Sequence, residues 1–174
     1  MAQTPIHDWV ERCRTGSLPT AIAKLPSGWV IMGERQVLPG YCLLLPDPVV
    51  PHLNALVPVA RAQFLIDMAL IGDVLLSITA AVRINYAIYG NVDPALHAHI
   101  FPRDSAEPEA MRTAQPWALD WTAAPLYSDA MHGDFKRRVG LELRKHYASS
   151  TSLSARETSP RLVSGAEQVI PRHK

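Results

Sequence analysis

The sequence has little cysteine and almost no net charge. Only Cys13 and Cys42 occur among the 174 residues, and they form neither a CxxC pair nor a disulfide framework. This scarcity excludes a zinc ribbon and favours a reducing, cytoplasmic compartment. The formal net charge of +1 gives no electrostatic basis for binding nucleic acid or an anionic membrane surface. We therefore expect neither of these as a partner.

Long hydrophobic runs and glycine-rich phosphate loops are also missing. The most apolar segment, Met68 to Val82, is interrupted by Asp73 and is too short to span a bilayer. Residues 7–12 interleave charged and aromatic side chains, so we expect no secretory signal there. Neither a Walker loop nor a GxGxxG motif occurs, which excludes phosphate binding through a glycine-rich helix start.

The patterning that is present indicates one domain of mixed secondary structure. The length suits a single domain with a sizeable core. Short apolar segments with turn residues nearby predict strands over residues 29–33, 41–45, 83–89 and 95–102. Apolar residues at helical spacing predict a long helix over 59–81, and a second helix is predicted over 129–147.

This order of elements predicts an α+β fold. An antiparallel sheet carries the long helix on one face, and a helix follows near the C-terminus. The domain is expected to span residues 1–147, with its core in 28–103. Residues 148–174 are rich in Ser, Thr, Arg and Pro and poor in large apolar side chains, so we expect a mostly disordered tail there.

The most specific feature of the chain is the octapeptide at residues 95–102, which reads ALHAHIFP and is followed by Arg103. Side chains alternate between the two faces of a strand, so His97 and His99 project to one side. The intervening apolar residues project to the other side, where a core can bury them. Two imidazoles on one rigid face suit nucleophilic or acid–base chemistry near neutral pH.

Three interpretations of the histidine pair stay open from these residues alone. The imidazoles could be metal ligands, but the nearest acids, Asp93 and Asp104, lie in flanking turns without a recognisable ligand spacing. The pair could also lie on a solvated strand face. The third interpretation is covalent nucleotidyl transfer, because one imidazole can attack phosphorus while its neighbour donates to a phosphate oxygen or the leaving group.

Three segments of this region together resemble the histidine triad superfamily. They are RINY at residues 83–86, the Gly90-Asn91 turn, and LHAHIFPR at 96–103. The similarity covers about residues 28–103 and is strongest to bacterial diadenosine-polyphosphate-hydrolase-like members. It implies that His97 is the nucleophile and that His99 contacts the phosphate or leaving group. It also implies a homodimer that shares the long helix and a sheet edge, and no catalytic metal or other cofactor.

Two positions depart from the family pattern, in which three histidines alternate with apolar residues. Ala95 stands at the first histidine position. The family's nucleophile needs from that residue a backbone carbonyl to hold its Nδ1–H, and Ala95 still supplies one. A second family histidine normally follows the proline that closes the second strand. Here Val49 takes that place, and His52 comes three residues later.

Other polar and aromatic residues near the pair are candidates for substrate contacts. Asn85, Asn91 and Arg103 could contact a nucleotide or phosphate, and their alternatives are hydrogen bonds within the sheet and turn or a solvated charge. Trp117 and Trp121 are expected to pack in the core or at a dimer contact, with a lid over the cleft as the alternative.

The sequence therefore predicts a nucleotide phosphohydrolase or nucleotidyl transferase. Its substrates would be dinucleoside polyphosphates or related nucleotide conjugates, cleaved through a nucleotidyl-histidine intermediate. The alternative is a catalytically weak nucleotide-binding or regulatory module on the same fold, which Ala95 and Val49 favour. Whether Nδ1 of His97 meets the Ala95 carbonyl, and whether a third imidazole enters the cleft, bears most directly on this choice.

Overall fold

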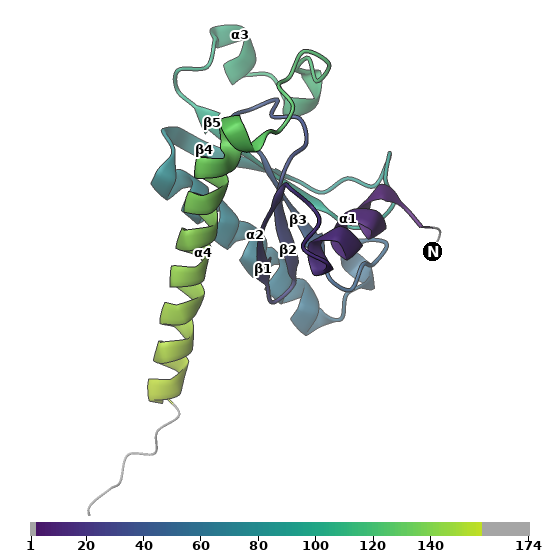
Figure 1. Cartoon of the computed structure of the whole chain (residues 1–174), viewed down its shortest axis with the longest axis vertical. Helices are drawn as coiled ribbons and strands as arrows, with labels where there is room; N and C mark the ends of the chain where they lie inside the picture. Colours follow the sequence, from purple (N-terminus) through teal and green to yellow (C-terminus); the bar gives the residue numbers. More distant parts are fainter. Residues whose placement is uncertain (1–2, 158–174) are drawn as a thin grey trace, which may run out of the picture.

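An antiparallel sheet forms the centre of the molecule (Figure 1). The computed structural model describes residues 3–157. The strands are β1 (Ala21–Leu25), β2 (Gly28–Met32), β3 (Cys42–Pro46), β4 (Ala81–Ala87) and β5 (Ala98–Asp104). They lie in the order β1-β2-β3-β5-β4, and each neighbouring pair is antiparallel. The predicted α+β class with an antiparallel sheet is confirmed.

Helices cover both faces of this sheet. They are α1 (Pro5–Arg14), α2 (Pro58–Ile78), α3 (Glu109–Arg112) and α4 (Asp129–Glu157), with 3-10 turns at Leu53–Ala55 and Pro116–Ala118. The long helix α2 and the first half of α4 pack on one face, and α1 packs on the other. Residues 105–128, between β5 and α4, form a segment at one end of the sheet that carries α3 (Figure 1).

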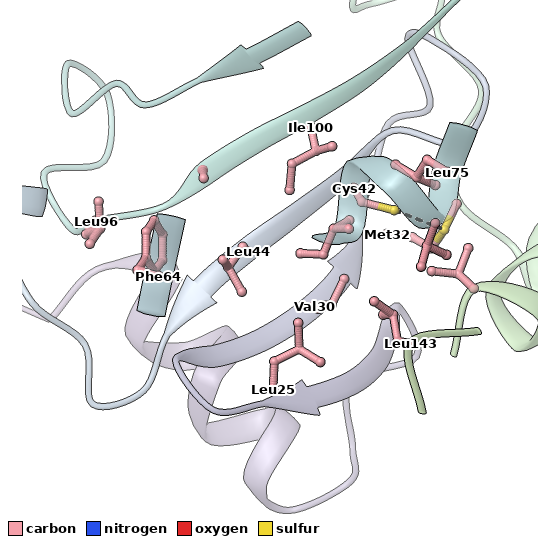
Figure 2. Close-up of a cluster of buried hydrophobic side chains, with 14 residues drawn as sticks. Leu25, Val30, Met32, Cys42, Leu44, Phe64, Leu75, Leu96, Ile100 and Leu143 are labelled. Carbon is pink, nitrogen blue, oxygen red and sulfur yellow. Dashed lines mark hydrogen bonds between the residues drawn. The ribbon is translucent and has the colours of Figure 1, made fainter. Parts of the chain in front are cut away.

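The core under α2 and α4 arises from strand alternation. Val30 and Leu44 on neighbouring strands face Phe64 of α2, and all three side chains are completely buried. Figure 2 shows these residues together with Leu25, Ile100 and Leu143, which extend the cluster from β1 to α4. Burying an apolar side chain of this size contributes about 1.5–3 kcal/mol, so this cluster is a major source of stability.

The opposite sheet face is closed by α1. Its buried residues Ile6, Val10 and Cys13 recur at helical spacing and pack against the strands. Pro5 occupies the first helical turn, where no hydrogen-bonded N–H is needed. The backbone N–H of Ile6 donates to Oδ2 of Asp93 over 3.1 Å, which ties the start of α1 to the loop before β5.

Several boundaries differ from the sequence-based prediction. Strand β1 was not predicted, because its short run carries small residues and Lys24 and lies at the sheet edge. Helix α2 ends at Ile78 rather than 81: the Thr79 hydroxyl donates to the Leu75 carbonyl and accepts from the Ala81 N–H, where β4 begins. The cap that Thr79 provides, together with the start of strand pairing in β4, sets this boundary.

Helix α4 is longer than expected. It begins at Asp129 as predicted but continues to Glu157, so residues 148–157 of the expected disordered tail are helical. This stretch contains neither proline nor glycine, the residues that most strongly end helices. The rest of the expected tail, 158–174, lies outside the described residues. Within residues 3–157, no helix is long and apolar enough to cross a membrane.

Candidate active site

His97 and His99 line one cavity on the sheet face that α1 covers. This histidine cavity has a volume of about 860 Å³. The centroids of the two imidazole rings are 4.7 Å apart. Leu96, Ala98 and Ile100 point the other way, into the core under α2. The predicted division of the octapeptide into an imidazole face and an apolar face is thus confirmed.

His97 itself lies just before β5, not within it as predicted. Leu96 donates its N–H to the Val50 carbonyl over 2.7 Å instead of joining the strand ladder. The Ala95 N–H donates to Oδ1 of Asp93 over 2.9 Å, while Oδ2 of the same carboxylate accepts from α1. Asp93 therefore fixes the backbone that carries the Ala95 carbonyl.

That carbonyl contacts the imidazole of His97. The distance from Nδ1 of His97 to the Ala95 carbonyl oxygen is 2.8 Å. A carbonyl oxygen only accepts hydrogen bonds, so the proton of the neutral ring lies on Nδ1. The lone pair of Nε2 is then available for attack on an electrophile. The buried side chain is only 8% exposed, which limits its orientations.

His99 is oriented by Tyr41, which comes from the start of β3. The Tyr41 hydroxyl lies 2.6 Å from Nδ1 of His99. Burial raises the pKa of this hydroxyl, so it stays protonated, and within the described residues it has no other hydrogen-bond partner. We infer that it donates to Nδ1, which places the ring proton of His99 on Nε2. Burial, with a smaller contribution from His97, lowers the pKa of His99 to about 3.

Aromatic side chains enclose His99 further. Its ring stacks parallel to Phe101 at 5.8 Å and meets the edge of Trp117 at 4.8 Å between centroids. Trp121 packs edge-on against Tyr41 at 5.7 Å and against Trp117 at 5.5 Å. Trp121 joins the core cluster under α1 as predicted, whereas Trp117 is 42% exposed and belongs to neither described core cluster. Both tryptophans line the histidine cavity.

The predicted polar contacts separate into two groups. Asn91 is exposed and lines the histidine cavity, where it can reach a bound molecule. Asn85 and Arg103 line a neighbouring cavity instead. Asn85 pairs with Phe101 across β4 and β5, so it lies on the same sheet face but further from His97.

Arg103 has a structural role that the sequence did not predict. Its guanidinium binds Glu107 through Nε and Nη2, and it also donates to Asn85 and to the carbonyls of Met111 and Ala114. All five N–H groups of an arginine side chain are thereby used. The predicted phosphate contact of Arg103 is therefore replaced by attachment of segment 105–128 to β5.

The position after the β3 proline, where the family pattern has a further histidine, holds no imidazole in this chain. Val49 packs against the core cluster under α1, and His52 is exposed at the start of a 3-10 turn, away from the lining of the histidine cavity. Among the described lining residues, His97 and His99 are the only imidazoles. Among the side chains that the structure describes, in residues 3–148, no three or more His, Cys, Asp or Glu form a group that could hold a metal ion.

Comparison with known proteins identifies the fold. No protein family model and no curated protein sequence matches the chain. A histidine triad protein from Bradyrhizobium japonicum matches with 23% identity and a TM-score of 0.62, over 70% of this chain and 88% of its own. One from Marinobacter aquaeolei matches with 14% identity and a TM-score of 0.65, over 83% and 98%. A hypothetical histidine triad nucleotide-binding protein from Sulfolobus tokodaii matches with 12% identity and a TM-score of 0.62, over 79% and 92%.

The chain therefore has the histidine triad fold. The resemblance seen in residues 28–103 is confirmed at this level, and the match extends beyond them to most of the chain. Within that fold, Ala95 stands at the first triad position, and the buried Tyr41 contacts the partly buried His99.

Proposed function

We propose that this protein is a nucleotide phosphohydrolase or nucleotidyl transferase acting on dinucleoside polyphosphates or related nucleotide conjugates. The 2.8 Å contact between Nδ1 of His97 and the Ala95 carbonyl carries the proposal. It leaves the lone pair of Nε2 available as a nucleophile, in a cavity large enough for a nucleotide. The fold is shared with histidine triad proteins, one of which is described as nucleotide-binding.

In the first step, Nε2 of His97 attacks the α-phosphorus of the substrate. An N–P bond forms, and the bond from phosphorus to the bridging oxygen breaks with its electron pair leaving on that oxygen. The positive charge that develops on the imidazole is stabilised by the Ala95 carbonyl through Nδ1–H. His99 donates its Nε2–H to a phosphate or leaving-group oxygen, and Asn91 contacts the nucleotide at the cavity wall.

In the second step, water attacks the phosphorus of the nucleotidyl-histidine. The N–P bond breaks, its electron pair returns to Nε2, and the water proton passes to solvent. A hydroxyl or amine in place of water gives nucleotidyl transfer. Both steps draw on groups of the chain, the substrate and water, so the proposal assigns no role to a metal or other cofactor.

The test is turnover of diadenosine tetraphosphate, followed by chromatography of the released mononucleotides. His97→Ala is expected to lower turnover by roughly 10³-fold or more because the covalent route is lost. His52→Ala is the matched control: it removes an exposed histidine outside the cavity and should leave turnover unchanged. Equal turnover in wild type and His97→Ala would contradict the proposal, provided that circular dichroism shows both folded.

A second candidate function is nucleotide binding without useful turnover. The absence of a third imidazole from the described cavity lining favours it, because Ala95 and Val49 leave fewer donors for phosphate oxygens. Tight nucleotide binding without product release by the wild-type protein would select this function over the first.

We also propose a homodimer formed through α2 and the outer edge of β4. Strand β4 is an edge strand, so its outer N–H and C=O groups have no partner strand in the described chain. Val82 and Tyr86 on this strand are 59% and 41% exposed. Leu65, Ile66 and Leu76 on the neighbouring α2 are also exposed, which extends the apolar surface.

A further inference from the structure

A second cavity lies beside the histidine cavity on the same face of the sheet. This outer cavity has a volume of about 720 Å³, and Tyr89 and Trp117 line both cavities. Register pairs Arg83 with Arg103 and Ala87 with His99 across β4 and β5. At about 3.3 Å per residue, the level of Arg83 lies about 13 Å along the sheet from that of His99. The two cavities therefore form consecutive parts of one surface.

Two guanidinium groups in the outer cavity have no partner among the described residues. Arg83 and Arg112 are exposed, and neither side chain forms a hydrogen bond or ion pair with another described residue. Arg103, by contrast, is neutralised by Glu107. Asp104 is the remaining acid of the lining, and its Oδ1 accepts the N–H of Ala106. The lining has one more cation than anions.

Asn85 adds a neutral donor to this cavity. Its Oδ1 accepts a hydrogen bond from Arg103 over 3.0 Å, which fixes the orientation of the amide. The amide nitrogen has no partner among the described residues. A fixed amide N–H₂ group beside two guanidinium groups is suited to contact phosphate oxygens.

The histidine cavity has the opposite charge balance. Glu34 and Asp93 contribute two carboxylates to its lining, and Arg35 is the single Lys or Arg among the described lining residues. Nη1 of Arg35 already donates to three carbonyls of segment 105–128. A chain of several phosphates would find little compensating charge there, so its distal part is electrostatically favoured in the outer cavity.

We propose that the outer cavity is a second anion subsite, which binds the phosphates distal to the one that His97 attacks. Arg83 and Arg112 hold these phosphates through charge-assisted hydrogen bonds, and Asn85 donates from its amide nitrogen. The proposal rests on the proposed function and narrows it: the preferred substrates are conjugates whose leaving half carries several phosphates.

Binding of inorganic tripolyphosphate to the full chain, measured by calorimetry at low salt, tests the subsite without turnover. Arg83→Gln combined with Arg112→Gln should weaken binding by about tenfold or more. Arg144→Gln is the matched control, because Arg144 is exposed on α4, outside both cavities. An equal loss in the control, or no loss in the double variant, overturns the subsite.

Kinetics with diadenosine tetraphosphate separate this inference from the proposed function. The double variant should raise KM by about tenfold while kcat changes little, and a nucleotide ester with a single phosphate should be unaffected. Turnover that needs His97 but shows an unchanged KM in the double variant overturns the subsite alone. Arginine-dependent tripolyphosphate binding without any turnover supports the subsite and contradicts the proposed function.

Discussion

At the residue scale, the two histidines of the site differ in what holds them. A backbone carbonyl holds Nδ1 of His97, whereas a tyrosine hydroxyl holds Nδ1 of His99. A carbonyl only accepts, and we infer that the Tyr41 hydroxyl donates, so the two rings carry their protons on opposite nitrogens. The ring with a free Nε2 lone pair can then attack phosphorus while its neighbour donates a hydrogen bond from Nε2–H.

Tyr41 is accordingly a positioning residue, and Tyr41→Phe tests it. We expect kcat to fall by about tenfold, the equivalent of one lost hydrogen bond of about 1.4 kcal/mol. The distinguishing measurement is the ¹⁵N NMR spectrum of the His99 ring, which should change from the Nε2–H form toward a mixture of tautomers. Tyr127→Phe removes a hydroxyl that binds Asp129 and should change neither. An unaltered His99 tautomer in Tyr41→Phe would show that the hydroxyl does not set it.

The low pKa of His99 predicts a pH-dependent stability. Burial lowers its pKa from 6.5 to about 3 in the folded chain, so between these values the unfolded chain binds a proton that the folded chain does not. The free energy of unfolding should therefore fall as the pH falls through this range, by at most about 1.4 kcal/mol per pH unit from this group. In His99→Gln, urea titrations should show a shallower decline; an identical decline would contradict the assignment.

At the scale of elements, a buried ion pair helps to attach segment 105–128 to β5. The Arg103 and Glu107 side chains are 7% and 9% exposed, and the guanidinium also binds two carbonyls of the segment. The same segment contributes Trp117 and Trp121 to the lining of the histidine cavity. Loss of the ion pair should therefore affect both the stability of the fold and the aromatic lining of the site.

Arg103→Met should destabilise the fold by about 3–5 kcal/mol, because the buried Glu107 carboxylate loses its cation and keeps only the Asp104 N–H as a donor. The double substitution Arg103→Met, Glu107→Leu should cost much less, since no unpaired charge remains. Chemical denaturation of both variants checks this difference. Equal destabilisation by the single and double changes would mean that the ion pair itself is not what Arg103 provides.

At the scale of the whole molecule, the proposed dimer predicts a mutation that separates the protomers. Val82→Arg places a charge on the exposed edge of β4 and should convert the dimer to a monomer. Leu141→Arg makes the same change on exposed α4, away from that edge, and should leave the dimer intact. Sedimentation analysis distinguishes the two, and a wild-type monomer would refute the proposed interface.

The sequence anticipated more of the fold than of the site. Strands β2, β3 and β4 and helix α2 were predicted within a few residues, whereas β1 and the end of α4 were not. Strands and helices with a strong apolar period can be predicted from their local sequence. An edge strand of small residues and an exposed helical end have no such period. The cytoplasmic localisation stays a prediction.

The sequence by itself determined that His97 and His99 face one side and that their apolar neighbours face the other. That result needs only the alternation of an extended backbone, which is a local property. The tertiary structure decided that Tyr41, 58 positions away, binds His99. It also decided that the N–H groups of the Arg103 side chain are all hydrogen-bonded within the protein, whereas those of Arg83 have no partner among the described residues. These outcomes depend on which distant segments pack together and which donors they satisfy, and neither can be read from spacing along the chain.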